Sequence, residues 1–217
     1  MSAPRDALAA LEARLCELYA LTPGVSVRDF VVDDAARPEL MAALGAQPSG
    51  APSAGREALL IHEEDDALNL ALLLEDRLTT SDPCDDAGLD EHCALLEGVS
   101  HLLYVVDRAR TGRPVSRLEL ELQAEVDKFL GTFVMRRLAG VEVCPLTLRH
   151  RLFRDCTYEA APEAMPRYRE ASRQAERYCT WLTRTYLERA RLDALLPEVR
   201  RFWRMSQSEK LGHIAAR

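Results

Sequence analysis

The sequence predicts an α+β fold that is mostly helical, with a small antiparallel sheet near the N-terminus packed on a helical bundle. Two long amphipathic segments, 89–110 and 116–139, are separated by a short break and therefore indicate a central antiparallel hairpin of helices. Alternating leucines within 57–75 indicate strands. With 217 residues, of which 47% are hydrophobic and 29% charged, the chain can bury a core without disulfide bonds.

The first 56 residues contain short predicted elements separated by turns. Leucines at spacings of three and four predict a helix over 6–21, which a Thr-Pro-Gly turn at 22–24 ends. The segment 25–32 is rich in β-branched residues and predicts a short strand. A proline in the first turn and a glycine past the end predict a short helix over 38–44. The segment 45–56 is small, polar and rich in Pro and Gly, so we expect a flexible loop there.

The segment 57–75 admits two interpretations. Every second residue from Leu68 to Leu74 is a leucine, which is a strand pattern, and the acidic cluster at 63–66 falls where a hairpin turn would lie. Leucine and alanine also have high helix propensity, so one long helix is the alternative. We favour the β-hairpin.

The two central helices have clear boundaries. The first is predicted over 89–110 and ends at a Thr-Gly pair. The second begins at Ser116 with Glu119 three residues later, which is the pattern of a capping box, and ends before Gly140.

Further helices are predicted along the C-terminal part, over 146–154, 163–192, 195–205 and 209–215. A second capping box, Ser206 with Glu209, precedes the last of them. We therefore divide the chain into an N-terminal α+β portion, 1–86, and a helical portion, 87–217, which we expect to form one compact unit.

The charge distribution is uneven. The net charge of −7 divides into −12 for residues 1–140 and +5 for residues 141–217. Two halves of opposite charge are expected either to face each other or to have different partners. No apolar run is long enough for a membrane helix, the N-terminus has no apolar signal core, and the six cysteines are scattered. We therefore expect a soluble protein of the bacterial cytoplasm with free thiols and no membrane association.

A candidate polar site lies on the two central helices. Glu97 and His101 are four residues apart and share one helix face, and the next helix carries Glu121, Glu125 and Lys128 at similar spacing. If these stripes face each other, carboxylates and an imidazole converge and could hold a metal or transfer protons. The interpretation we favour is nevertheless a solvated helix face, and a buried structural network is a further alternative. The Glu-x-x-His pairs of di-iron bundles are absent.

A candidate partner-binding surface lies near the C-terminus. Arg169, Arg173 and Arg177 step by four and share one face. This face is expected to be solvated or docked on the acidic N-terminal part; the alternatives are that it contacts a protein or, because acidic residues interrupt it, less favourably a nucleic acid. Phe202 and Trp203 either pack in the core or anchor a partner.

Common catalytic and cofactor signatures are absent from the sequence. It contains no P-loop, no GxGxxG, no GxSxG and no HExxH, so we expect no cofactor and no dedicated metal site. The favoured hypothesis is a non-catalytic interaction or regulatory protein that contacts a protein partner or forms a homo-oligomer. The alternatives are a helical metal-binding protein or enzyme that uses the Glu/His site, and a weak nucleic-acid binder.

Overall fold

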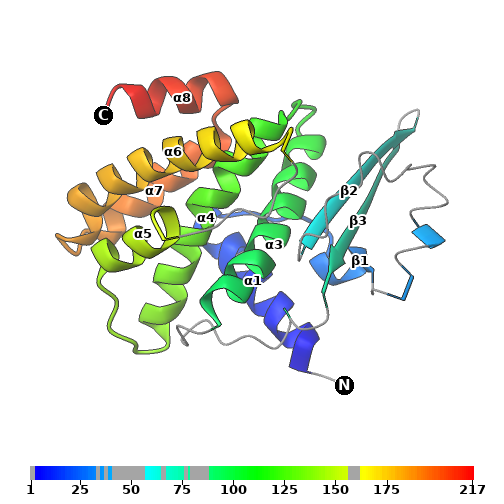
Figure 1. The fold of residues 1–217 in the computed structure, drawn as a ribbon, viewed down its shortest axis with the longest axis horizontal. Helices are drawn as coiled ribbons and strands as arrows, with labels where there is room; N and C mark the ends of the chain where they lie inside the picture. The colour runs from blue at the N-terminus through cyan, green and yellow to red at the C-terminus, as the bar shows by residue number, and fades with distance from the viewer. Residues whose placement is uncertain are drawn as a thin grey trace.

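The computed structural model describes residues 3–32, 35–36, 39–40, 57–64, 67–75, 78, 88–155 and 162–217. A three-stranded sheet lies on one side of two central helices and the remaining C-terminal helices lie on the other side (Figure 1). This arrangement confirms the predicted α+β, mostly helical fold. The elements in chain order are α1 (Ala3–Tyr19), η1 (Val27–Phe30), β1 (Val31–Val32), β2 (Glu57–Glu64), β3 (Ala67–Leu74), α3 (Leu89–Arg110), α4 (Arg117–Leu138), α5 (Pro145–Phe153), α6 (Met165–Leu182), η4 (Thr183–Leu187), α7 (Leu192–Arg204) and α8 (Gln207–Ala215).

The predicted β-hairpin is confirmed, and the alternative of one long helix is wrong. Strands β2 and β3 pair antiparallel, with Glu57 opposite Leu74 and Glu64 opposite Ala67. The alternating leucines explain why a strand forms here, because Leu72 and Leu74 lie on the same face of β3 and pack against α3. They contact it at Gly98, where an added methyl group would lie 3.0 and 3.4 Å from their side chains. The sheet is mixed rather than purely antiparallel, because β1 pairs parallel with β3.

The prediction of a strand over 25–32 is correct only at its end. Only Val31–Val32 form a strand, while Val27–Phe30 form a single 3₁₀ turn. The local cause is Ser26, whose hydroxyl caps this turn by accepting from the Arg28 amide. The predicted loop over 45–56 lies outside the described residues, and so does the predicted helix over 38–44 apart from residues 39–40.

The central helix hairpin is confirmed with the expected boundaries. Helix α3 ends at a turn in which Gly112 adopts a positive φ of 62°, and Ser116 caps α4 by accepting from the Glu119 amide at 3.0 Å. The second half of the predicted capping box does not form. The Glu119 side chain instead points inward and accepts hydrogen bonds from Tyr104 and Arg108.

The long C-terminal helix predicted over 163–192 is divided in the structure. The α-helix ends at Leu182 and continues as a π-helical segment to Leu187, and Ala190 then adopts a positive φ of 51° before α7 begins. The capping box at Ser206 and Glu209 starts α8 as predicted. Among the described residues, no helix combines the length and the apolar character that crossing a membrane requires.

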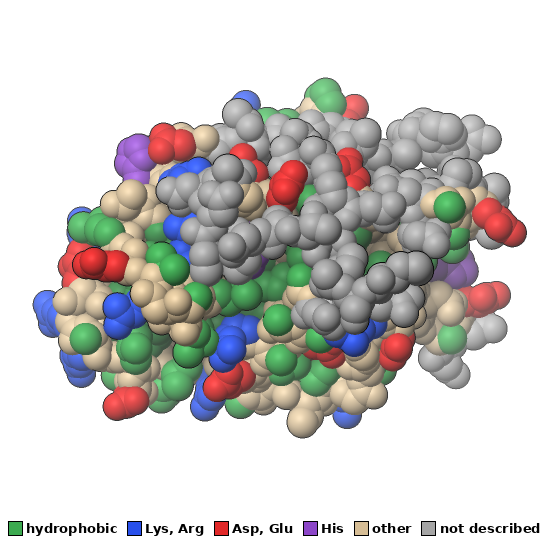
Figure 2. Space-filling model, turned by 90° about the horizontal axis from the view of Figure 1, so that it is seen from below, with side chains coloured by type: hydrophobic (Ala, Val, Ile, Leu, Met, Phe, Trp, Pro, Cys, Tyr) green, Lys and Arg blue, Asp and Glu red, His purple; other side chains and the backbone are tan. Residues whose placement is uncertain are grey.

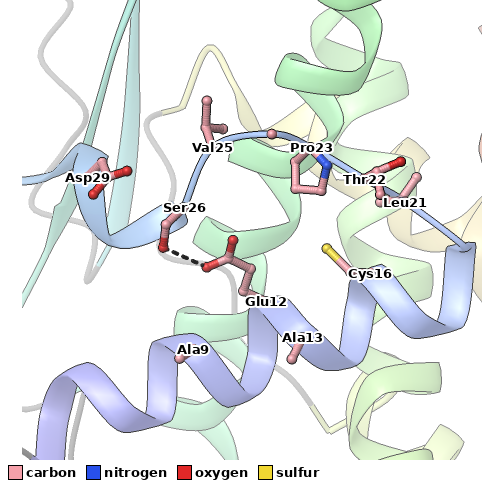
Figure 3. Close-up of a pocket in the computed structure, with 11 residues that line it drawn as sticks. Ala9, Glu12, Ala13, Cys16, Leu21, Thr22, Pro23, Val25, Ser26 and Asp29 are labelled. Carbon is pink, nitrogen blue, oxygen red and sulfur yellow. Dashed lines mark hydrogen bonds between the residues drawn. The ribbon is translucent and has the colours of Figure 1, made fainter.

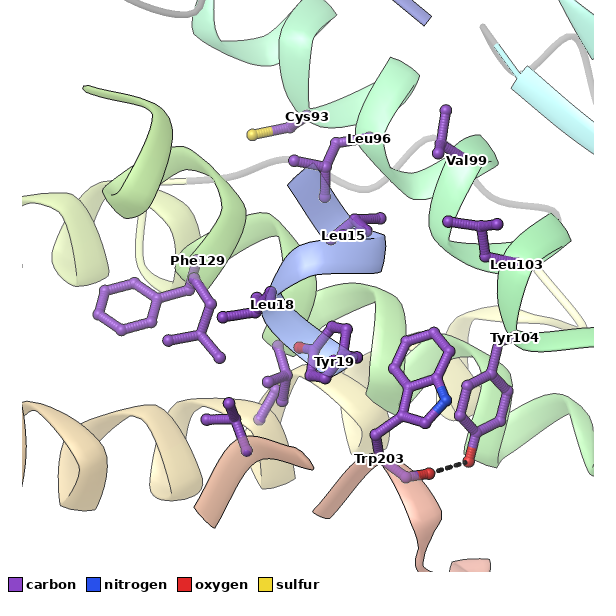
Figure 4. Packing of buried hydrophobic residues seen from close by; sticks show 14 of the residues in the cluster. Leu15, Leu18, Tyr19, Cys93, Leu96, Val99, Leu103, Tyr104, Phe129 and Trp203 are labelled. Carbon is purple, nitrogen blue, oxygen red and sulfur yellow. Dashed lines mark hydrogen bonds between the residues drawn. The ribbon is translucent and has the colours of Figure 1, made fainter. Parts of the chain in front are cut away.

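The core lies where α1, α3, α4, α6 and α7 meet. Leu15, Leu18 and Tyr19 of α1 point into it between the central helices, and Trp203 of α7 closes one end (Figure 4). The rings of Tyr19 and Trp203 stack with their centroids 4.3 Å apart. Helix α1 is thereby packed on the helical portion, with its contacts to α3, α4 and α7.

Candidate functional site

The four carboxylate and histidine candidates on the central helices come together in one buried cluster. Glu97 and His101 on α3 face Glu121 and Glu125 on α4, and the exposed fractions of His101, Glu121 and Glu125 are 5%, 6% and 4%. Glu57, at the start of β2, joins them from the sheet. The interpretation of these stripes as a solvated face is therefore wrong.

His101 lies between two carboxylates of this cluster. Its Nδ1 is 4.0 Å from Glu57 Oε1 and its Nε2 is 3.5 Å from Glu121 Oε2. Both separations are charge contacts rather than well-formed hydrogen bonds. One ligand atom from each of Glu57, Glu97 and His101 lies within 4.8 Å of the other two. A search of the described residues for three metal-ligating side chains within this distance of one another finds this group.

Two cations complete the cluster. The Lys128 ammonium donates to Glu97 Oε2 at 2.9 Å and to Glu125 Oε1 at 2.6 Å. Arg167, in the first turn of α6, places its Nε 3.5 Å from Glu121 Oε1. The side chain of Arg167 is 27% exposed, whereas that of Glu121 is 7% exposed, so the cluster approaches solvent on the side of α6.

The cluster favours bound protons when it holds no metal. Burial lowers the pKa of His101, but the carboxylates around it, above all Glu121, more than offset this effect and raise the pKa to about 9. Burial raises the pKa of Glu57 to about 8, against the opposing effect of the His101 imidazole. A divalent cation would compete with these protons for the same atoms.

The carboxylates next to Lys128 respond differently to burial. Burial raises the pKa of Glu97, but the Lys128 ammonium and His101 lower it to below its ordinary value. Burial raises the pKa of Glu125, and Lys128 offsets this only in part. Burial lowers the pKa of Lys128, but Glu125 and Glu97 raise it well above its ordinary value. Lys128 is therefore a permanent cation in this cluster.

Several polar atoms of the cluster are buried without a hydrogen bond among the described residues. They are Glu57 Oε2, His101 Nε2, Glu121 Oε2 and Arg167 Nε. Leaving such an atom unbonded costs about 1–3 kcal/mol. Buried polar atoms are ordinarily bonded, so this concentration of unbonded atoms distinguishes the cluster from a finished structural network.

Glycine 98 permits the sheet to contribute to the cluster. A methyl group at Gly98 would lie 3.2 Å from Glu57 Oε2, closer than most side-chain contacts. The absence of a side chain on this turn of α3 therefore lets the Glu57 carboxylate lie against the helix beside Glu97.

Sequence reasoning missed Glu57 and Arg167. The signal for Glu57 was an acidic residue at the start of the apolar half of a strand, opposite Leu74. Arg167 had no comparable signal, because the packing of α6 on α4 brings it to the cluster.

The partner-binding candidates have two different environments. Arg169, Arg173 and Arg177 are all exposed on one face of α6, and Arg173 forms a two-point contact with Glu170 at 3.0 and 2.8 Å. Phe202 and Trp203 are 1% and 0% exposed, which confirms the core location over the alternative of a partner anchor. Neither aromatic ring is therefore available to a partner in this structure.

Nucleic-acid binding through the exposed arginines of α6 stays a prediction. On the face shown in Figure 2, basic and acidic side chains of the described residues alternate rather than forming a continuous basic track.

A surface pocket of about 540 Å³ lies between α1 and the segment 21–29 (Figure 3). One of its two carboxylates, Glu12, accepts from the Ser26 hydroxyl and the Val27 amide, both at 3.1 Å, so it holds the loop in place. Ala9 and Ala13 form its small apolar floor. This pocket lacks the converging charges of the buried cluster.

A second buried polar network lies near the other end of the α3–α4 hairpin. The Tyr104 hydroxyl donates to Glu119 at 2.6 Å and accepts from Lys210 at 2.8 Å, and Arg108 also donates to it. Lys210 makes a second hydrogen bond to Gln123 at 2.7 Å. Arg108 binds the carbonyls of Trp203 and Met205, so this network joins α3, α4, α7 and α8.

Comparisons with known proteins identify no relative of this chain. No family model matches it, and neither the curated proteins nor the solved structures searched contain a match.

Proposed function

We propose that this protein binds one divalent metal ion at Glu57, Glu97 and His101. The observation that carries the proposal is the convergence of these three side chains within 4.8 Å, around a buried imidazole whose Nδ1 faces Glu57 at 4.0 Å. Two carboxylates and an imidazole suit first-row ions such as Zn²⁺, Mn²⁺ or Fe²⁺. Mg²⁺ and Ca²⁺ are less favoured, because they prefer oxygen ligands alone.

The surroundings of the three ligands support this assignment. His101 presents Nδ1 towards Glu57 and Nε2 towards Glu121. A metal-binding histidine commonly donates its second N–H to a carboxylate, which fixes the ring and increases its basicity. Glu121 occupies that position. Lys128 holds the Glu97 carboxylate in the same way, through its hydrogen bond to Oε2.

The number of ligands favours a reactive centre over a purely structural one. Structural zinc sites are closed by four protein ligands, whereas catalytic sites have three and leave a position for water or substrate. A metal held here would polarise an oxygen bound at that position, and the neighbouring carboxylates Glu121 and Glu125 could accept a proton from it. Metal-assisted hydrolysis is the reaction class that this set of groups fits best.

The interaction hypothesis stays a prediction. The arginines of α6 are exposed and could still contact a partner. Phe202 and Trp203, the other candidate contact residues, are buried, so the hypothesis now depends on the arginines alone. Reversing Arg169, Arg173 and Arg177 to Glu should abolish capture of a specific partner if this face binds one, and unchanged capture would exclude the face.

Titration calorimetry of chelator-treated protein with Mn²⁺ and Zn²⁺ tests the metal proposal, with elemental analysis of the purified protein as a second measurement. We expect one equivalent per chain, with affinity reduced at least 10-fold in His101→Ala and in Glu57→Gln. His150→Ala is the matched control, because the His150 side chain is 67% exposed and pairs with Asp155, outside the cluster. Equal affinity in His101→Ala and wild type would reject the site.

A further inference from the structure

The Lys128 ammonium occupies the position between two carboxylates where a second cation could lie. Its Nζ is 2.9 Å from Glu97 Oε2 and 2.6 Å from Glu125 Oε1. Glu97 also belongs to the metal group, so one carboxylate is shared between the three-ligand site and the lysine. Carboxylates that bridge two cations are the usual basis of dinuclear centres.

The charges of the cluster balance with one divalent metal ion, one lysine and one arginine. It contains four carboxylates, from Glu57, Glu97, Glu121 and Glu125. One divalent ion, the Lys128 ammonium and the Arg167 guanidinium together carry four positive charges. Burying unbalanced charge is costly, so replacing the ammonium by a neutral group would leave a buried carboxylate pair that favours another cation.

The use of lysine at this position is selective. The chain has 28 basic residues, and only Lys128 and Lys210 are lysines; the rest are arginines. The structure places both lysines in buried polar clusters, with Lys210 fully buried and the Lys128 side chain 16% exposed. An ammonium is compact and can fill a position between two oxygens where the planar guanidinium of arginine is too large.

From these observations we infer that Lys128 is the residue that restricts the cluster to a single metal ion, by holding the second cation position between Glu97 and Glu125. This inference rests on the proposed metal site at Glu57, Glu97 and His101. It assigns Lys128 a role in metal stoichiometry, and it predicts that a neutral residue at 128 converts the site from mononuclear to dinuclear.

Metal stoichiometry in Lys128→Met, a change that keeps the length of the side chain and removes its charge, tests this inference. Full-length proteins treated with chelator are titrated with Mn²⁺, and bound metal is counted after gel filtration. We expect one equivalent in the wild type and two in Lys128→Met. The double variant Glu125→Gln/Lys128→Met should return to one equivalent, because it removes the carboxylate that the second ion needs.

Lys210→Met is the matched control, because it removes the other buried lysine, which lies outside the cluster, and should leave one equivalent. If Lys128→Met does not fold, Lys128→Gln serves in its place, since it keeps a hydrogen-bond donor to both carboxylates. Wild type is also titrated to millimolar Mn²⁺, where a second equivalent bound at the cluster would overturn the inference.

The outcomes separate the two proposals. No metal in the wild type rejects the proposed function itself. One equivalent in both wild type and the folded variant at 128 retains the metal site and rejects the role of Lys128. Two equivalents that return to one in the double variant support the inference.

Discussion

At the scale of single residues, hydrogen bonding distinguishes the two buried polar clusters. Lys210 is fully buried, and its Nζ has two acceptors, Tyr104 at 2.8 Å and Gln123 at 2.7 Å. In the cluster around His101, by contrast, buried atoms of three charged side chains besides His101 have no hydrogen bond to a described residue. Among the described residues, the network around Lys210 leaves one buried atom unbonded, Arg108 Nε, whereas the cluster around His101 leaves four, and unbonded groups gain from a ligand. We therefore assign the first network to structure and the second to function.

The residue scale also shows what the sequence could predict of the site. The pairing of Glu97 with His101, and of Glu121 with Glu125, followed from helical spacing alone. Glu57 could not be found in this way, because it comes from a strand 40 residues earlier, and periodicity does not say which helix the sheet covers. The sequence also could not decide whether these four side chains are buried, since an amphipathic helix can turn its polar stripe either to solvent or to a neighbouring helix.

Asp127 provides a pH-dependent prediction in the structural network. Burial raises its pKa to about 6 from an ordinary value of 3.8, although Ser100, Tyr19 and Gln123 all donate to it. The folded protein therefore binds more protons than the unfolded chain between about pH 4 and 6. The stabilisation associated with this proton is fully present below pH 3.8 and is lost as the pH rises through 6.

Chemical denaturation at several pH values measures this effect in wild type and in Asp127→Asn. We expect the free energy of unfolding of the wild type to fall relative to that of the variant by a few kcal/mol, on the order of 1.4 kcal/mol per pKa unit, between pH 4 and 7. The difference between the two proteins removes the contributions of other groups that titrate in this range. Parallel pH profiles would show that Asp127 ionises as it does in the unfolded chain.

At the scale of elements, the close approach of α3 and α4 depends on a small residue. A methyl group at Gly131 of α4 would lie 2.6 Å from Leu96 Cδ1 of α3, and Leu96 is fully buried and cannot move into solvent. Gly212 of α8 is the opposite case, because a methyl group there would meet no atom of a described residue within 4 Å. Glycine lowers helix stability by the same amount at both positions, but only at Gly131 does the missing side chain make room for a neighbouring helix.

We predict opposite effects for alanine at these two positions. Gly131→Ala should lower the free energy of unfolding by about 1–3 kcal/mol, because overpacking forces the helices apart. Gly212→Ala should raise it by about 0.5–1 kcal/mol, because alanine loses less backbone entropy in a helix. Urea denaturation followed by circular dichroism measures both. Equal stabilisation by both changes would mean that the interface at Gly131 is looser than the structure shows.

Element boundaries were predictable wherever they depended on local chemistry. Ser116 and Ser206 start α4 and α8, and the alternating leucines form β3, because capping and period-two burial are properties of a few neighbouring residues. Two predictions failed for other reasons. Glu119 leaves its expected cap to bind Arg108 on the facing helix. Residues 27–30 turn because Ser26 caps them locally and Glu12 of α1 holds the Val27 amide. The contacts of Glu119 and Glu12 join separate elements, which periodicity within one element does not register.

At the scale of the whole molecule, polar contacts attach the C-terminal helices to the body. Arg108 binds carbonyls at the end of α7, and Lys210 of α8 binds Tyr104 of α3 and Gln123 of α4. His213 of α8 contacts Glu198 of α7 at 2.5 Å, and both side chains are buried. Because Lys210 of α8 bonds to side chains on both α3 and α4, the attachment of α8 depends on these two helices being folded together.

We predict that α8 unfolds together with the helical body and does not detach on its own. Lys210 reports this directly, because its buried amine can react with an acylating reagent only when α8 opens. The free energy of opening obtained from the acylation rate of Lys210, measured by mass spectrometry of its peptide, should equal the global free energy of unfolding within about 1 kcal/mol. Lys128 should react faster, because its side chain is 16% exposed. An opening free energy for Lys210 several kcal/mol below the global value would instead make α8 a separately opening element, and its buried lysine would then be exposed in the native ensemble.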